Sequence, residues 1–311
     1  DCDILEYATN YNKVYNDTYK WLINKRHLSS YDSQTHDIEK ATMIRPICCT
    51  FKYDESKMVA LDMNKAYCSN LMDMKKFPVF NSFDRYQKYD NHKIEDYTMY
   101  YIRATNKTTA SAILFDTEYS RAYGYKLNRI NKDLFEILSF KRPSNLIDTH
   151  SEEKIKEIYE NKDLSKTSKK QIINILLGIM EKKYTKKNKC HCFLTKEEAQ
   201  YYIETYGGVL GELTYFEDTP DGLFAVGNQE ERIIYTVVQS KEKELINGFL
   251  PIKEMIYDIQ RYKLYTMYTK CRAHNIQVYG IKTDCILVRE SDARKLYEAF
   301  EADLNDEIGK Y

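Results

Sequence analysis

Two apolar, β-branched runs near the C-terminal end of the chain are separated by only three residues, and this spacing constrains the fold more than any other feature. The runs cover residues 276–281 and 285–288, with Lys282, Thr283 and Asp284 between them. A connection this short predicts an antiparallel β-hairpin. Apolar side chains recur at helical spacing just before and just after the hairpin. The chain is therefore expected to pack helices against an antiparallel sheet, which is an α+β fold.

The composition also favours long helices. The chain has 10 Gly and 5 Pro among 311 residues, far below the roughly 12% that these two residues contribute on average, which makes a turn-rich sandwich or barrel improbable. Apolar spacing predicts helices over 3–26, 64–74, 165–182, 251–274 and 291–304. Strand-like runs cover 58–61, 97–104 and 134–140, with polar loops between the last two. Residues 29–39 predict a polar connector, and 190–240 an insertion with its own hairpins.

Several protein classes are excluded by the sequence. No apolar stretch approaches the ~18 residues of a membrane span, so no membrane partner is expected. The eight cysteines are scattered through a chain too long to need disulfides, which favours a reducing, intracellular compartment. The cluster Cys190-His191-Cys192 is tighter than the usual Cys-x2-Cys zinc spacing and has no second pair, so a zinc site is not predicted.

Charge is segregated along a chain whose formal net charge is zero. Residues 154–189 hold eleven Lys against four acidic residues, and residues 290–307 hold seven acidic against two basic residues. A basic segment of this kind can face a polyanion such as nucleic acid while the whole molecule stays neutral. The alternative interpretation is a solvated helix surface in a Lys-rich protein.

Two carboxylates stand at the ends of apolar strand-like runs. Asp62 directly follows the run 58–61, and Asp284 lies in the turn of the predicted hairpin. Phosphoryl transfer with two divalent ions needs carboxylates held rigidly, because two cations about 3.5–4 Å apart must be fixed and neutralised. The alternative is that Asp62 caps the following helix and Asp284 only occupies a turn.

Four residues on the predicted helix 165–182 are spaced four apart: Lys166, Lys170, Asn174 and Gly178. Residues at this spacing form one stripe along a helix. Its lysines could reach phosphate oxygens, and its Gly lets a backbone approach a base pair. Asn174 stands in an apolar run, so a buried structural Asn with surface lysines is the competing interpretation.

Taken in order, these segments resemble the polymerase domain of the family B DNA polymerases, most closely the protein-primed branch encoded by viruses, linear plasmids and mobile elements. The family's first motif, Asp-x-x-Ser-Leu-Tyr-Pro-Ser, is similar to residues Asp62 to Ser69. Its second, Lys-x3-Asn-Ser-x-Tyr-Gly, is similar to Lys170 to Gly178, and its third, Tyr-x-Asp-Thr-Asp-Ser, to Tyr279 to Cys285. Residues 250–270 match its palm helix in position and character, and residues 1–5 resemble the end of its last exonuclease motif, with Asp1 as the carboxylate.

The resemblance implies a palm, built from an antiparallel sheet with packed helices, and helical fingers. It implies template-directed DNA synthesis by nucleotidyl transfer from a dNTP to a primer 3′-hydroxyl or a protein hydroxyl. Asp62 and Asp284 would bind two Mg²⁺ ions, with Mn²⁺ as the alternative. Lys170, with Lys166, Asn174 and Gly178 on the same helix, would bind the nucleotide, and Tyr67 would exclude a sugar 2′-hydroxyl. The implied partners are a DNA template-primer, a dNTP and a terminal priming protein.

The implied domain boundaries follow the motifs. Residues 1–50 would contain the end of the exonuclease region and a connecting helix, 51–150 the first palm part with an insertion, and 151–189 the fingers helices. Residues 190–240 would be a second insertion and 241–311 the second palm part with the hairpin. Nothing before Tyr311 resembles the family's thumb. The insertions 75–150 and 183–240 would hold the priming-protein and strand-wrapping regions.

The third motif departs from the family where Lys282 replaces the first Asp. Lys282 is expected either to contact a DNA phosphate beside Tyr279 and Thr283, or to point into solvent on the opposite face of its strand. Cys68, Ile175 and Leu177 also replace family residues. Two rival functions stay open: a polymerase-like scaffold that binds nucleic acid without chemistry, and a reverse-transcriptase-like palm, although such hairpins usually carry adjacent Asp residues and here Cys285 follows Asp284.

Overall fold

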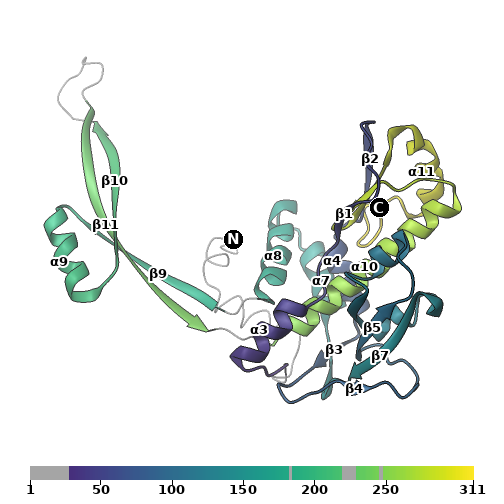
Figure 1. Cartoon of the computed structure of the whole chain (residues 1–311). Coiled ribbons are helices and arrows are strands. Elements are labelled where there is room, and N and C mark those ends of the chain that lie inside the picture. The colour runs from purple at the N-terminus through teal and green to yellow at the C-terminus, as the bar shows by residue number, and fades with distance from the viewer. Residues whose placement is uncertain (1–27, 182–183, 219–228, 245–247) are drawn as a thin grey trace. The chain divides into compact units, whose positions relative to one another are not determined.

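The protein has two compact units, residues 1–182 with 246–311 and residues 183–245. A computed structural model describes residues 28–181, 184–218, 229–244 and 248–311 (Figure 1). The expected first helix, 3–26, and Asp1 lie outside the described residues. No helix within the described ranges combines the length and the apolar character needed to cross a bilayer.

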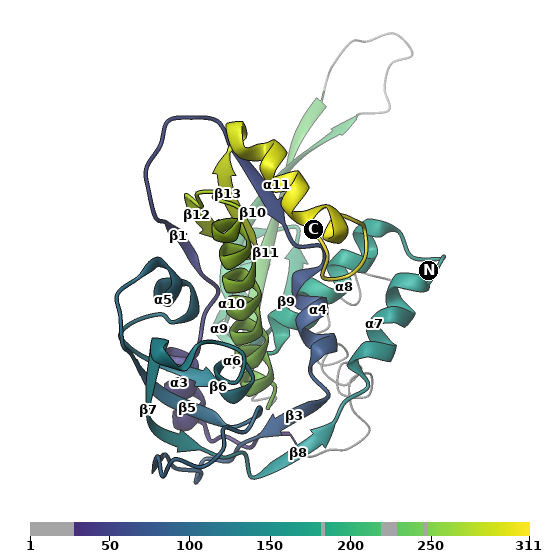
Figure 2. The ribbon, with the colours of Figure 1, turned by 90° about the vertical axis from the view of Figure 1, so that its right-hand side faces the viewer.

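One long helix organises the first unit. Helix α10 (Leu250–Ala273), expected from the apolar spacing, has Pro in its first turn and is buried along most of its length. Pro fits there because the first-turn N–H groups have no partner within the helix. Figure 2 shows α10 running along the middle of the unit, with helix α4 (Ala66–Asp73) beside it and helix α7 (Ser151–Glu160) further out. The side-chain amide of Asn70 on α4 donates a hydrogen bond to Gln260 Oε1 on α10 at 2.7 Å, which links α4 to α10.

The sheet that carries both candidate carboxylates is antiparallel throughout. Its strand order is β1 (Cys48–Thr50), β12 (Gly280–Lys282), β13 (Cys285–Arg289) and β2 (Met58–Asp62). The expected hairpin is confirmed as β12 and β13, although its first strand is shorter than the apolar run. Ile276 and Val278 are buried in the core, but Ile276 donates its N–H to Cys271 O at the end of α10 and so cannot pair in the sheet.

An apolar cluster joins one face of this sheet to the helices. Leu61, Ile286 and Val288 from the sheet pack with Leu264 and Met267 from α10. Helix α11 (Ala293–Phe300), inside the expected range 291–304, adds Leu296 and Phe300. Because side chains alternate across a strand, this burial turns Asp62 to the opposite, open face.

A second antiparallel sheet has the order β4 (Gln87–Lys88), β7 (Phe135–Lys141), β5 (Met99–Ala104) and β6 (Tyr119–Tyr123). Strands β5 and β7 confirm the runs at 97–104 and 134–140. The expectation of loops alone between them is wrong, since this segment also forms helix α5 (Thr109–Leu114), β6 and helix α6 (Gly124–Leu127). The start of α5 is fixed by a capping box between Thr108 and Ser111. The segment around it is rich in polar residues and so resembles a loop in the sequence.

The polar connector expected at 29–39 is also wrong, because most of it belongs to helix α3 (Ser33–Thr42). Asp32 caps this helix by accepting the Thr35 N–H at 2.7 Å, and His36 is buried against the unit. Helix α8 (Lys166–Ile179) begins as expected, with Ser165 accepting the Ser168 N–H at 3.1 Å. The remaining elements of the first unit are strands β3 (Lys76–Val79) and β8 (Asn145–Asp148) and the 3₁₀ turns Lys132–Leu134, Glu290–Asp292 and Glu301–Asp303.

The second unit is a three-stranded antiparallel sheet with one helix. Its strand order is β10 (Val209–Asp218), β11 (Gln229–Glu244) and β9 (Tyr184–Phe193), and helix α9 (Lys196–Tyr206) connects β9 to β10. The antiparallel pairing of β11 with β10 and with β9 agrees with the expectation of hairpins within 190–240. His191 in the cysteine-flanked cluster meets the Tyr202 hydroxyl of α9 at 3.0 Å.

Candidate active site

Asp62 and Asp284 lie side by side although they are 222 positions apart in the chain. Asp62 ends β2 and pairs in register with Cys285, the residue that follows Asp284. Both carboxyl groups line one cavity, and Met63 donates its N–H to Asp284 O at 3.2 Å. The pairing of β2 with β13 therefore brings the two strand-end carboxylates together, as expected.

The charge of this pair is not balanced by the protein alone. Burial, and then the negative charge of Asp62, raises the pKa of Asp284 to about 6, while the Lys170 ammonium acts in the opposite direction. Two carboxylates that share a site disfavour each other's ionised form. The arrangement is one that a bound cation would stabilise.

A cavity of about 300 Å³ opens beside the two carboxylates. Six of the residues expected at a nucleotide site line it: Asp62, Tyr67, Lys166, Lys170, Asn174 and Asp284. The structure thus brings residues from all three motif segments to one cavity.

Of the four residues spaced four apart on helix α8, only three line the cavity. Lys166, Lys170 and Asn174 line it, but Gly178 does not. Each step of four residues rotates the side chain by about 40°, so Gly178 is turned roughly 120° away from Lys166. Asn174 is exposed rather than buried in the apolar run, so the interpretation as a buried structural Asn is wrong.

The two α8 lysines of the cavity, Lys166 and Lys170, have no acidic partner among the described residues. Within the ranges that the structure describes, no carboxylate lies within ion-pair distance of Lys166 or Lys170. On the adjacent helix α7, by contrast, Lys154 pairs with Glu157 at 2.8 Å and Lys156 with Glu152 at 3.0 Å. Unpaired ammonium groups in a concave site are suited to binding an anion.

Tyr67, in the first turn of α4, is half-buried beside this cavity. Its ring meets the Tyr257 ring of α10 edge-on, with 5.7 Å between the centroids. Burial, and to a smaller extent the nearby Asp284 carboxylate, raises the pKa of Tyr67 to about 12. The ring is therefore neutral and held in place by packing, as a steric element would have to be.

The hairpin turn holds the other residues singled out from the third motif. Thr283 has φ 60°, the left-handed conformation that tight hairpins use, and donates its N–H to Ile47 O at 2.8 Å. Lys282 pairs with Cys285, which in turn pairs with Asp62, so Lys282 is on the same sheet face as Asp62 and is exposed there. Its expected contact with a phosphate stays a prediction. Tyr279 is buried under the Lys52 and Arg289 side chains, at 5.9 and 5.1 Å from its ring centroid.

Three further residues of the cavity lining, Asn64, Lys65 and Tyr159, were not predicted from the sequence. Asn64 and Lys65 lie inside the first motif, so their position next to Asp62 was the available signal. Tyr159, on α7, had none, because only the packing of α7 against α4 brings it to the cavity.

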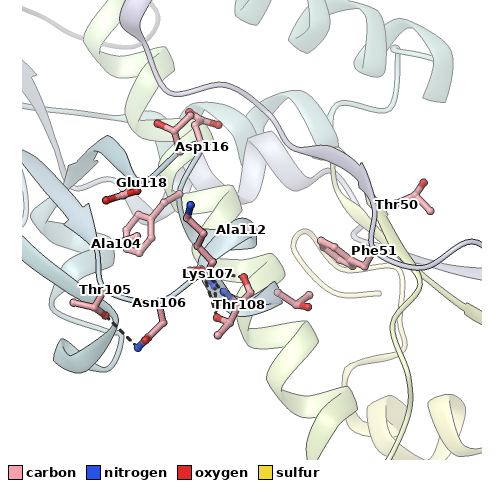
Figure 3. A pocket seen from close by; sticks show the side chains of 14 residues that line it. Thr50, Phe51, Ala104, Thr105, Asn106, Lys107, Thr108, Ala112, Asp116 and Glu118 are labelled. Carbon is pink, nitrogen blue, oxygen red and sulfur yellow. Dashed lines mark hydrogen bonds between the residues drawn. The ribbon is translucent and has the colours of Figure 1, made fainter.

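A second, larger cavity of about 640 Å³ lies elsewhere in the first unit, with Thr105 and Asn106 on one side and Phe51 on the other (Figure 3). Its lining is rich in Thr, and one of its two carboxylates, Asp116, forms an ion pair with Arg261. None of the residues singled out from the sequence lines it. Size alone therefore does not identify the site, and the smaller cavity holds the convergent charged groups.

Comparisons with known proteins give similarities of fold but none of sequence. No protein-family model matches the chain, and no curated protein matches it by sequence. Solved structures similar to it include phi29 DNA polymerase complexed with primer-template DNA in a post-translocation binary complex, at 14% identity and a TM-score of 0.53, over 99% of this chain and 53% of that chain. A ternary complex of phi29 DNA polymerase with primer-template DNA and incoming nucleotide substrates matches at 10% identity and a TM-score of 0.50, over 99% and 54%. The chain thus spans about half the length of that polymerase, and the likeness supports an α+β fold with antiparallel sheets.

Proposed function

We propose that the protein is a DNA-directed DNA polymerase that transfers a nucleotide from a dNTP to a primer 3′-hydroxyl or a protein hydroxyl. The observation that carries the proposal is the convergence of Asp62, Asp284, Lys166 and Lys170 on one cavity. Nucleotidyl transfer requires clustered carboxylates facing cationic groups. In the other cavity (Figure 3) the lining carboxylates are Asp116 and Glu118, and Asp116 is already paired with Arg261. In this proposal the sheet of β1, β12, β13 and β2 is the palm, and α7 and α8 are the fingers.

The donor set fits divalent magnesium. Two carboxylates that line one cavity provide hard oxygen ligands and excess negative charge, and burial together with the charge of Asp62 raises the pKa of Asp284. Asp62 and Asp284 would hold two Mg²⁺ ions, with Mn²⁺ as the alternative. When bound, such ions activate the attacking hydroxyl and neutralise the triphosphate.

The other lining residues would orient the substrate. Lys170 and Lys166 on α8 would bind phosphate oxygens, and Asn174, one turn further along α8, would lie toward the nascent base pair. Tyr67, packed on Tyr257, would limit the space below the sugar. The partners proposed are a DNA template-primer, in keeping with the solved complexes of similar fold, and a terminal priming protein.

Extension of a labelled DNA primer on a DNA template, with dNTPs and Mg²⁺, tests the proposal. We expect products whose length and sequence follow the template and that disappear with EDTA. Extension on an RNA template but not on DNA would favour the reverse-transcriptase-like alternative. Template-primer binding without any extension, in Mg²⁺ or Mn²⁺, would favour the non-catalytic scaffold.

Replacing Lys170 by Ala should weaken dNTP binding and leave DNA binding nearly unchanged, because its proposed partner is the triphosphate. Loss of one charge-assisted contact, about 1.5 kcal/mol, corresponds to an increase in the apparent KM for dNTP on the order of tenfold. Steady-state extension kinetics and a primer-template binding titration measure the two effects. Lys162→Ala, an exposed lysine that does not line the cavity, is the matched control. A loss confined to DNA affinity would contradict the assignment.

Trimming Tyr67 to Val should relax the choice of sugar, since the proposed mechanism depends on the bulk of the ring. We expect the ratio of ribonucleotide to deoxynucleotide incorporation to rise by roughly tenfold or more. Tyr67→Phe, which keeps the ring, should leave the ratio near the wild-type value. Competition between one rNTP and its dNTP at a single template position gives the ratio. An unchanged ratio in the Val variant would show that Tyr67 only packs against Tyr257.

A further inference from the structure

Lys65 occupies an unusual position in the cavity wall. It stands three residues after Asp62, immediately before helix α4, and its backbone is left-handed with φ 52° and ψ 43°. It lines the same cavity as Lys166 and Lys170, but from the α4 side rather than from α8. Left-handed backbone is uncommon for a non-Gly residue and is kept where the surrounding structure enforces it.

The contacts of the Lys65 ammonium are weak ones. It lies 4.6 Å from the centroid of the Tyr159 ring and 3.3 Å from the carbonyl oxygen of Asp306. Among the described residues no carboxylate is within ion-pair distance of it. A half-buried ammonium held only by an aromatic face and a carbonyl keeps most of its capacity to bind a phosphate oxygen.

The loop that carries Lys65 is fixed before any ligand arrives. Asn64 donates its N–H to Lys310 O at 2.6 Å and its side-chain amide to Asn305 O at 2.7 Å, and it accepts the Gly309 N–H at 2.7 Å. Gly309 has φ 82°, and a Cβ there would meet the Ser69 side chain at 2.2 Å, so only Gly allows this approach. The C-terminal segment 305–311 therefore holds the loop in place, which lowers the cost of ordering a bound ligand.

The start of α4 adds to the same electrostatic field. Lys65 makes no side-chain cap, so the first-turn N–H groups of α4 have no side-chain acceptor at the cap position. Such groups carry partial positive charge and favour anions. Together with the Lys65 ammonium they form a positive wall next to the carboxylate pair.

We infer that Lys65 is a third cationic ligand for the triphosphate of the incoming nucleotide, acting from the α4 side of the cavity while Lys166 and Lys170 act from α8. The inference rests on the proposed function and adds a residue to the nucleotide site. On binding, the Lys65 ammonium leaves the Asp306 carbonyl for a phosphate oxygen, and the Tyr159 ring continues to shield one side of it. No bond is made or broken in this step.

The test separates the Lys65 charge from its backbone conformation. Asn tolerates the left-handed region, so Lys65→Asn removes the cation without adding backbone strain, and Lys65→Arg keeps the charge. Binding of the complementary dNTP with Mg²⁺ is measured by calorimetry on the full chain bound to a primer-template with a dideoxy-terminated primer. We expect Kd for the dNTP to rise on the order of tenfold in Lys65→Asn and to stay within about threefold in Lys65→Arg, with primer-template affinity unchanged. Lys162→Asn is the matched control and should bind the dNTP as the wild type does.

The possible outcomes separate the role of Lys65 from the polymerase activity. If the wild-type protein neither extends primers nor binds the dNTP, the proposed function fails. If it does both and Lys65→Asn binds the dNTP as tightly as the wild type, the role of Lys65 is overturned and the proposed function stands. Equal weakening in the Asn and Arg variants would also overturn it, because the side chain would then act by shape. Thermal melting of each variant confirms that the compared proteins are folded.

Discussion

Asp62→Asn and Asp284→Asn are each expected to lower primer extension by at least about 1000-fold, because each removes one of two carboxylates that must fix divalent ions together. The change is nearly isosteric and affects charge alone. Single-turnover extension with saturating dNTP measures the chemical step. Both variants should bind template-primer with an affinity close to that of the wild type, since Asp62 and Asp284 carry no positive charge for the DNA backbone.

Folding should be retained in both variants. Asp62 is exposed at a strand end and Asp284 lies in a turn, and removing one of two adjacent like charges relieves repulsion in the metal-free protein. Asp133→Asn, an exposed residue of a 3₁₀ turn far along the chain, is the control and should extend primers normally. Extension within tenfold of the wild type by either site variant would rule out this carboxylate pair as the catalytic centre.

Asp258→Ala is expected to destabilise the first unit by about 3–5 kcal/mol, because it leaves the buried Lys126 ammonium without its carboxylate partner. Asp258 on α10 and Lys126 on α6 are both almost fully buried, with 2.5 Å between Lys126 Nζ and Asp258 Oδ1. Asp258 also accepts the Tyr123 N–H at 2.8 Å, and Lys126 donates to Leu114 O at 2.6 Å. The pair therefore connects the central helix to the second sheet. Urea unfolding monitored by circular dichroism measures the loss.

The double variant Lys126→Met, Asp258→Leu tests the physical cause. Replacing both members of a buried ion pair by apolar residues of similar size is often neutral or stabilising, whereas removing one member leaves an uncompensated charge. The double variant should therefore recover most of the stability lost in Asp258→Ala. If the single variant loses less than about 1 kcal/mol, water reaches Lys126 and the pair is not buried in solution.

Local features explain which elements could be predicted from the sequence. Helix α10 has an uninterrupted apolar repeat with Pro at its start, and the β12–β13 hairpin has two β-branched runs with a short connection, so neither needs long-range information. Helix α3 was missed because its residues are mostly polar and its stability comes from the Asp32 cap and the burial of His36. Helix α5 was missed for a similar reason, since a capping box within a Thr-rich segment resembles a loop.

By itself the sequence determined the strand ends that carry Asp62 and Asp284, and the helix that carries Lys166, Lys170 and Asn174, because periodicity and capping act over a few residues. Only the tertiary structure decided which of these side chains meet. The pairing of β2 with β13 joins segments 222 positions apart, and helix rotation turns Gly178 away from the cavity that Lys170 lines. The place of Lys65 depends on the C-terminal segment that binds Asn64. Contacts of this kind come from burying α10 and the sheet in one core, and no local pattern encodes them.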